Sequence, residues 1–184
     1  MKTYLDPEDV ELMEEAATCP RDRVLIRLLF RLGCRISEAL ALKIVDIDFD
    51  RHTVTIDHLK RRTRLTCPQC RARLAKSHVF CPKCGVGVEK MVAREEEHHR
   101  VRTLPLDSNT LNLLRDYIAE GGSGAQDDNM LVFSINRHRA WHVVRECATR
   151  AGLPALVNPE TGKARGVSPH RLRDAFAVHA VKTR

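Results

Sequence analysis

The sequence predicts an α+β fold that is mainly α-helical, with a small antiparallel β-sheet and an inserted four-cysteine ribbon. Apolar residues at helical spacing dominate both ends of the 184-residue chain. Two short runs of strand-like sequence flank its middle, and two closely similar pairs of cysteines lie between those runs. The length allows one sizeable domain with a small added module.

The helices are predicted from their apolar spacing and from their start and stop signals. Asp6 and Asp107 can each cap a helix start, because a short carboxylate accepts from free backbone N–H groups. Gly33 is expected to end a mostly buried helix, because glycine takes left-handed backbone angles without strain. Helices are expected to begin near residues 7, 21, 37, 108, 137 and 169.

Two segments are predicted to be strands. Residues 53–56 are rich in β-branched side chains, and this strand is expected to run on towards Lys60. Residues 101–106 are the expected return strand, with Pro105 near its end. We expect the two strands to pair, with the cysteine segment as the long connection between them.

The positive charge of the chain is concentrated in one region. The chain has a net charge of +7, and residues 60–84 hold eight Lys and Arg but no Asp or Glu. Without those eight, 23 of the 31 basic residues remain, against 24 acidic ones. Local positive charge of this density favours a phosphate backbone as partner, and double-stranded DNA is the partner we expect. A solvated basic surface without a partner is the alternative.

The sequence also indicates in which cellular compartment the protein is located. No apolar run approaches the about 20 residues of a membrane-spanning helix, and the N-terminal sequence has no signal-peptide pattern. We therefore expect a cytoplasmic protein without a membrane partner. Its seven cysteines are then expected to be reduced or bound to metal. Cys19, Cys34 and Cys147 lie in helical contexts and are predicted core residues.

The remaining four cysteines form two Cys-Pro-x-Cys knuckles. Cys67 and Cys70 belong to the first, Cys81 and Cys84 to the second, and ten residues separate the two knuckles. Two such knuckles can surround one ion with four thiolates, so the pattern predicts a structural Zn²⁺ site. A redox pair or disulfides are the alternatives. His78 can also serve as a ligand, although four cysteines already complete the set.

Two arginines and a histidine form a candidate phosphate site. Arg35 follows Gly33 at a tight helix-to-helix joint, where its planar fork of donors can bind a phosphate with two hydrogen bonds. His170 and Arg173 are three residues apart, so they face one side of the positive N-terminal end of the last helix. Each feature alone is also typical of ordinary surface residues, and it is their combination that favours a phosphate site.

These three residues, together with Lys60 and the Arg-Thr-Leu-Pro-Leu return strand, resemble the catalytic domain of the tyrosine recombinase (phage integrase) family. The order along the chain fits as well. The resemblance covers residues from about 4 to 182 and is interrupted by the cysteine segment. Its most specific parts are residues 30–42 and 168–176.

The resemblance implies a domain organisation and an activity. Residues 1–184 would form a tyrosine recombinase-like catalytic domain, incomplete at its C-terminus, with a zinc ribbon inserted at residues 66–98. The implied activity is DNA integration or site-specific recombination, by phosphoryl transfer on duplex DNA through a 3′-phosphotyrosyl intermediate. Other recombinase protomers on the DNA would be further partners.

The resemblance also implies a role for each candidate catalytic residue. Arg35 and Arg173 would bind the non-bridging oxygens of the scissile phosphate and stabilise the transition state. Lys60 would protonate the leaving 5′ oxygen as general acid, and His170 would assist proton transfer at the nucleophile. Glu38, one helical turn from Arg35, would support that arginine.

Further basic residues are expected to contact DNA. Arg61 and Arg62 compete with Lys60 for the general-acid role by position, but a guanidinium does not readily give up a proton. We expect the ribbon to extend the DNA-facing surface and to add phosphate contacts, whereas the alternative is a ribbon that stabilises the hairpin or binds protein. The predicted DNA-binding residues are Arg61, Arg62, Arg64, Arg71 and Arg73.

The sequence departs from the family pattern at its end. The family needs a tyrosine nucleophile beyond the last of these motifs, and neither Tyr4 nor Tyr117 matches that position. His179 is too close to Arg173 to be the further histidine of the family, and it is expected on the same helix. The chain alone is therefore expected to bind a phosphate without forming the phosphotyrosyl bond.

Three functions compete at this stage. The first is a DNA strand-exchange enzyme present as an incomplete catalytic domain. The second is a non-catalytic DNA-binding protein on the same fold, and the third is a zinc-ribbon adaptor for another protein. A continuation past Arg184 with further histidine and tyrosine motifs would favour the enzyme. A DNA affinity that does not fall steeply with salt would favour the adaptor.

Overall fold

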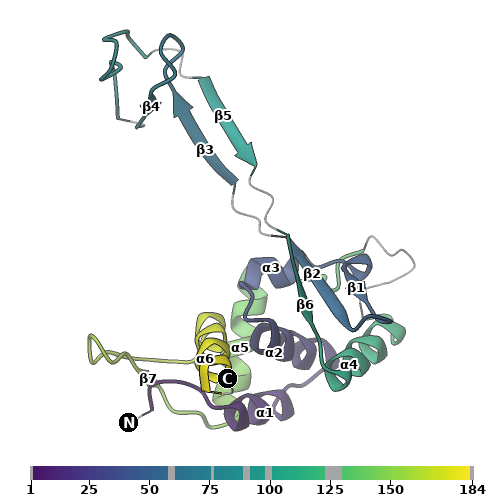
Figure 1. The fold of residues 1–184 in the computed structure, drawn as a ribbon. Coiled ribbons are helices and arrows are strands. Elements are labelled where there is room, and N and C mark those ends of the chain that lie inside the picture. Colours follow the sequence, from purple (N-terminus) through teal and green to yellow (C-terminus); the bar gives the residue numbers. More distant parts are fainter. Residues whose placement is uncertain are drawn as a thin grey trace. The chain divides into compact units, whose positions relative to one another are not determined.

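A computed structural model describes residues 2–57, 61–75, 77–88, 92–97, 101–122 and 130–182, with the backbone alone for 61–64 and 92–97. The chain divides into two compact units (Figure 1). The first unit combines residues 1–57 with residues 101–184, and the second consists of residues 58–100. Helices make up most of the first unit, and strands with irregular turns make up the second.

The first unit is built around the helix α2. This helix packs against α1, α4, α5 and α6, and its side chains from Val24 to Leu29 include five that are essentially inaccessible to solvent. Its apolar residues are too many for one stripe, so burial on several sides follows from the sequence. The helices are α1 (Pro7–Glu15), α2 (Pro20–Leu32), α3 (Ile36–Leu40), the 3₁₀ turn η1 (Ile44–Asp46), α4 (Ser108–Ala119), α5 (Arg137–Arg150) and α6 (Pro169–Lys182).

A three-stranded antiparallel sheet completes the first unit. Its strand order is β1 (Ile47–Asp48), β2 (Thr53–Asp57) and β6 (Val101–Pro105). The pairing of β2 with β6 runs from Thr53 opposite Pro105 to Asp57 opposite Val101, so the predicted pairing of the two strands is confirmed. Val54 and Ile56 point into the helical core, as the alternation of a half-buried strand requires.

The joint between α2 and α3 matches the prediction from Gly33. This glycine caps α2 with φ of +53°, in the left-handed region. A Cβ atom added there would overlap the ring of Phe176 on α6. Only glycine therefore allows the start of α3 and the middle of α6 to approach so closely, and this contact positions Arg35 relative to the α6 residues.

The second unit contains a separate sheet and a small core of its own. Strand β3 (Arg61–Thr66) pairs with β4 (Arg73–Leu74) on one side and with β5 (Val92–Glu97) on the other. Among the side chains described in this unit, the buried core consists of Cys67, Leu74, Cys81 and Val88. Two of these four are candidate metal ligands, so the described apolar core of this unit is small.

Residues 154–168 contain a short hairpin. Strands β7 (Leu156–Val157) and β8 (Ala164–Arg165) pair through two residues each. The side chain of Asn158 stabilises the turn of this hairpin, because its Oδ1 accepts from the backbone N–H groups of Glu160 and Thr161 at 2.8 and 3.1 Å. The strands are too short for a periodic signal in the sequence.

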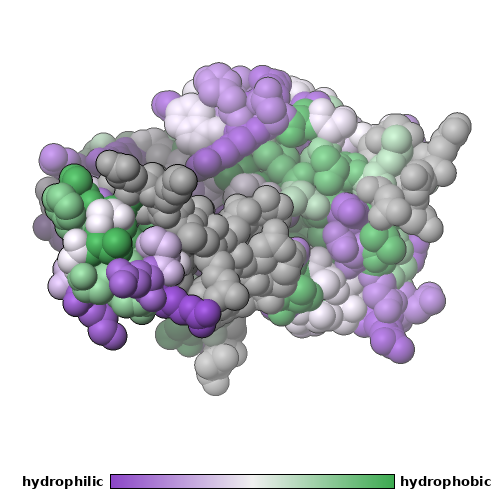
Figure 2. All heavy atoms as spheres, turned by 90° about the horizontal axis from the view of Figure 1, so that it is seen from above, coloured by the Kyte–Doolittle hydropathy of each residue, from purple (hydrophilic) through white to green (hydrophobic). Residues whose placement is uncertain are grey.

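The surface mixes polar and apolar side chains. On the face drawn in Figure 2, hydrophobic residues are visible between hydrophilic ones. Among the residues described, no helix combines the length and the apolar character that a membrane crossing demands.

Candidate functional site

A cavity of about 410 Å³ lies where the α2–α3 joint, α5 and the start of α6 meet. Three of the four predicted catalytic residues, Arg35, His170 and Arg173, line it, although they are far apart in the sequence. The other lining residues are Cys34, Ile36, Ser37, Arg137, Trp141, Ser168 and Pro169.

The guanidinium of Arg173 is poised for an acceptor that enters this cavity. Its Nη1 is buried and has no hydrogen-bond partner within the part of the chain that the structure describes. A buried donor without a partner costs about 1–3 kcal/mol, more if it is charged, so this arrangement is favourable once an anion supplies the acceptor. The orphaned donor therefore points to an anionic ligand.

Arg35 is oriented by a buried carboxylate. Its Nη1 donates to Glu38 Oε1 at 2.9 Å, and its backbone N–H donates to Glu38 Oε2, also at 2.9 Å. Arg102 on β6 donates from Nη2 to the same Oε2 at 3.1 Å. Glu38 is only 4% exposed, whereas the Arg35 side chain is 42% exposed. The carboxylate thus fixes a half-exposed guanidinium at the cavity, with charge-assisted bonds.

His170 lies at the mouth of the same cavity. Its side chain is 80% exposed, and its Nε2 is 3.7 Å from Asp174 Oδ1, one helical turn further along α6. The backbone N-terminus of α6 also faces the cavity, because Ser168 and Pro169 line it. The positive end of the helix dipole adds to the attraction for an anion there.

Sequence reasoning missed three residues of this site. Arg137 and Trp141 of α5 line the cavity, and Arg102 shares the carboxylate of Glu38. The four-residue spacing of Arg137 and Trp141 places them on one helix face, which is a usable signal. The sequence carries no comparable signal for the contact between Arg102 and Glu38, because it joins two elements that are far apart in the chain.

Three other reactive side chains, Cys34, Tyr4 and Tyr117, do not supply a nucleophile to this cavity. Burial, followed by the negative charge of Glu38, raises the pKa of the Cys34 thiol to about 12, so this thiol stays protonated at neutral pH. Tyr117 is 3% exposed and donates to the Gly122 carbonyl at 2.6 Å, so it is a residue of the core. Neither Tyr117 nor Tyr4 lines the cavity.

The general-acid candidate and the predicted DNA-binding arginines are described only in part. Lys60 lies outside the described residues. Three of the predicted DNA-binding residues, Arg61, Arg62 and Arg64, belong to β3, where only their backbone is described. Arg71 and Arg73 are exposed on the cysteine segment.

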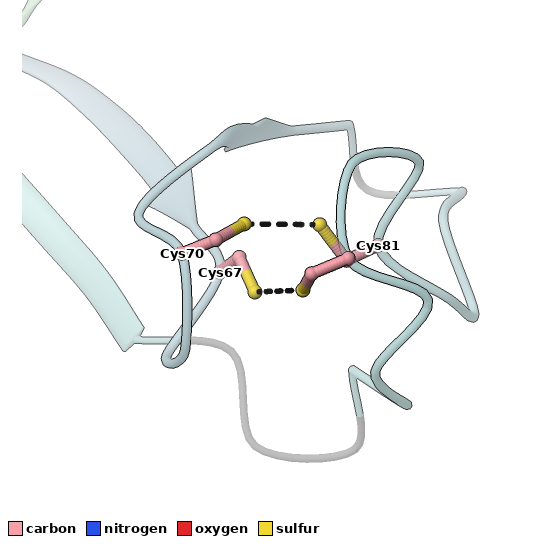
Figure 3. A group of neighbouring side chains, drawn as sticks. Cys67, Cys70 and Cys81 are labelled. Atoms are coloured by element: carbon pink, nitrogen blue, oxygen red, sulfur yellow. Dashed lines mark hydrogen bonds between the residues drawn. The ribbon is translucent and has the colours of Figure 1, made fainter.

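The four predicted metal ligands come together in the second unit. Their sulfur atoms all lie within 4.8 Å of one another, and Figure 3 shows the side chains of Cys67, Cys70 and Cys81 converging. Cys70 Sγ is 3.5 Å from Cys81 Sγ, and Cys67 Sγ is 3.6 Å from Cys84 Sγ. These distances are far too long for disulfides, and they approach the about 3.8 Å between sulfurs of a tetrahedral Zn²⁺ site with about 2.3 Å bonds. The donor set therefore fits Zn²⁺.

The two knuckles share one backbone conformation. Cys67 N–H donates to Ala72 O at 2.9 Å, and Cys81 N–H donates to Val86 O at 2.8 Å. Four residues after each first cysteine the backbone is left-handed, with φ of +57° at Arg71 and +73° at Gly85. This repeated turn brings backbone N–H groups to the first sulfur of each knuckle. Hydrogen bonds from the Cys84 backbone lower the pKa of Cys81 to about 6, which favours a thiolate.

The fold and the cavity define a helical domain with a cationic site suited to an oxyanion. Two guanidiniums, a histidine and a helix N-terminus converge on one cavity, and a buried carboxylate holds one of the guanidiniums in place. Such a site binds a tetrahedral anion through short, charge-assisted hydrogen bonds, and it can stabilise negative charge that develops on that anion.

Comparisons with known proteins show which proteins this chain is similar to. The phage integrase family matches residues 3–79. The tyrosine recombinase XerD of Neisseria meningitidis serogroup B is 26% identical over 162 residues, which are 88% of this chain and 42% of XerD. The crystal structure of the XerA recombinase has a TM-score of 0.64 and 19% identity, over 100% of this chain and 52% of XerA. The integrase of transposon Tn1549, solved with transposon right end DNA, has a TM-score of 0.54 and 15% identity, over 100% of this chain and 54% of that one.

Sequence and fold therefore both support a catalytic domain of the tyrosine recombinase family, which confirms the resemblance predicted from the sequence. The observed mixture of helices and small antiparallel sheets is similar to the folds of these recombinases, as expected. The chain spans less than half the length of the XerD relative that it matches.

Proposed function

We propose that this chain binds duplex DNA and holds one backbone phosphate in the cavity for strand cleavage and rejoining during site-specific recombination. The observation that carries this proposal is the convergence of Arg35 and His170 with the buried, unpartnered Nη1 of Arg173. The relatives of the chain support it, because the curated ones are tyrosine recombinases and the Tn1549 integrase was solved with DNA.

In the proposed mechanism the two arginines bind the non-bridging oxygens of the phosphate and stabilise the charge of the transition state. A tyrosine, which we assign to no residue of this chain, attacks phosphorus as the bond to the 5′ oxygen breaks. Lys60 donates the proton to that oxygen, because an ammonium can give up a proton and a guanidinium cannot. His170, held near Asp174, assists removal of the proton from the nucleophile.

DNA binding and its salt dependence test the proposal. We expect Arg173→Gln to weaken binding of a fluorescent duplex about 10–100-fold, because it removes a charged group that bonds a phosphate. The slope of log affinity against log salt should fall by about 0.9, as expected for one lost phosphate contact.

Arg51→Gln is the matched control, because Arg51 lies on an exposed turn with its side chain 84% accessible. It removes the same charge outside the cavity and should leave the affinity within about twofold of that of the unchanged chain. Equal effects of the two substitutions, or a wild-type affinity that does not depend on salt, would overturn the proposal.

We further propose that Cys67, Cys70, Cys81 and Cys84 hold a structural Zn²⁺. Four thiolates leave no open position, so the ion would stabilise the fold of the second unit rather than take part in catalysis. Metal analysis of the purified chain should give one zinc per chain, and Cys81→Ser should abolish it. Cys19→Ser is the control, since Cys19 lies outside the cluster; equal zinc content in the two variants would contradict the site.

A role for the second unit in DNA binding is also proposed. Its exposed Arg71 and Arg73, together with the arginines of β3, would contact phosphates. Deletion of residues 67–84 should then reduce both the affinity for duplex DNA and the salt slope. Unchanged values after the deletion would remove the ribbon from the DNA-binding surface.

A second candidate function is a zinc-ribbon adaptor, which the exposed apolar pair Val79 and Phe80 favours. These side chains are 69% and 65% exposed and lie next to the second knuckle. Adjacent exposed apolar residues are more typical of a protein contact than of a phosphate contact. The adaptor predicts that the deletion of residues 67–84 leaves DNA binding intact. A non-catalytic DNA-binding protein would instead bind DNA without cleaving it.

A further inference from the structure

A second cavity, of about 650 Å³, adjoins the first and has no role in the mechanism above. The two cavities share Trp141, Ser168 and His170, which therefore form the wall between them. The remaining lining residues come from α5, from the β7–β8 hairpin and from the start of α6. They are Arg145, Asn158, Arg165, Gly166, Val167, Arg171 and Asp174.

The second cavity carries an excess of positive charge. Three arginines and one carboxylate line it. Asp174 is shared between Arg171, at 3.5 Å, and His170, at 3.7 Å. No ion pair of Arg145 or Arg165 with an acidic side chain occurs in the described ranges of the chain, so two guanidinium charges are left for a ligand.

Arg145 is held in place by its surroundings. Its guanidinium lies 4.8 Å from the centre of the Trp141 ring, a cation–π contact that keeps the charge while restricting the side chain. The backbone of Gly166 lies close to this guanidinium, because a Cβ atom added there would be 3.7 Å from Arg145 Nη2. A guanidinium stacked on Trp141, whose donors make no hydrogen bond to the described residues, is prepared for an anionic acceptor.

The arginines that α5 contributes to the two cavities lie roughly two helical turns apart. Arg137 lines the first cavity and Arg145 the second, and they are eight positions apart on α5, which corresponds to about 12 Å along the helix. One DNA strand carries a charge every about 3.4 Å of helix axis, so several phosphates fall within that distance. Two phosphates of one backbone can therefore occupy the two cavities together.

We propose that the second cavity binds another backbone phosphate of the same DNA, with Arg145 and Arg165 as its ligands. The inference rests on the proposed function, because it takes DNA as the ligand of the first cavity. The bound phosphate would fix the direction of the strand past Trp141 and would thus position the phosphate of the first cavity for reaction.

The salt dependence of DNA binding separates this inference from the proposed function. We expect Arg145→Gln to lower the slope of log affinity against log salt by about 0.9. Arg139→Gln is the matched control on the same helix, because Arg139 already pairs with Glu146 at 3.3 Å and lines neither cavity. A wild-type chain without salt-dependent binding would overturn the proposed function. If the wild-type chain binds DNA in a salt-dependent way but Arg145→Gln and Arg139→Gln have equal salt slopes, only the second phosphate site would be overturned.

Neutral phosphate analogues give the sharper test. Duplexes that carry one methylphosphonate each, moved along both strands of a defined recombination site, remove one phosphate charge at a time. At one position, the methylphosphonate should lower the DNA affinity of the wild-type chain about tenfold. At that same position, it should leave the DNA affinity of Arg145→Gln unchanged. The affinity of Arg173→Gln should be insensitive at a different position. If both variants become insensitive at the same position, or neither does at any, the second cavity does not bind a phosphate of its own.

Discussion

Substitution of Gly33 by alanine tests how the fold builds the cavity. The backbone there has φ of +53°, and an L-residue in the left-handed region costs about 1–2 kcal/mol. The added Cβ would also overlap the Phe176 ring, and overpacking of this kind typically costs about 1–3 kcal/mol. We therefore expect Gly33→Ala to lower the free energy of unfolding by about 2–5 kcal/mol, a large part of the about 5–15 kcal/mol of a typical domain.

Urea denaturation of the zinc-saturated chain, followed by circular dichroism, measures this loss. The Phe176→Ala background separates the two causes, because it removes the overlap but keeps the backbone strain. In that background Gly33→Ala should cost only about 1–2 kcal/mol. An equal loss in both backgrounds would refute the close packing of α6 on the joint, and a loss below about 1 kcal/mol would refute the strain as well.

Two further substitutions test the carboxylate and the knuckles. Glu38→Gln should lower the free energy of unfolding by about 1–3 kcal/mol and weaken DNA binding, because Arg35 and Arg102 lose a charged acceptor. An unchanged DNA affinity would show that Glu38 does not orient Arg35. Arg71→Gly should raise zinc affinity about two- to fivefold in competition with a chelator, since it relieves left-handed strain in a turn coupled to the metal. Gly85→Ala should lower that affinity, and equal affinities of the two variants would contradict the shared knuckle geometry.

The structural features predicted well from the sequence are those that depend on residues close together in the chain. Gly33 ends α2 through its left-handed backbone, which is a local signal, and Asp107 caps α4 by accepting from Thr110 N–H at 2.9 Å, three residues away. The two Cys-Pro-x-Cys pairs repeat the same short turn, so the spacing within each pair brings its two sulfurs together, and all four sulfurs meet in the folded unit. The pairing of β2 with β6 followed from two strand-like runs on either side of one insertion.

The parts that were missed depend on contacts between distant elements. Arg102 reaches Glu38 across 64 positions of sequence, and Trp141 reaches the start of α6 only when α5 packs beside it. Trp141 lies on a helix that the sequence predicts, but no local signal indicates that it lines both cavities and is 36% exposed. Helical periodicity gives the face on which a residue lies, but the neighbour of that face is set by tertiary packing.

The central claim is that Arg35, His170 and Arg173 contact one phosphate. Crystals of the chain soaked with tungstate, a heavy analogue of phosphate, test it most directly through anomalous diffraction. We predict one peak in the first cavity within hydrogen-bond distance of all three side chains, with Arg173 Nη1 among its donors. A tungstate bound elsewhere, or in contact with only one of the three residues, would contradict the account.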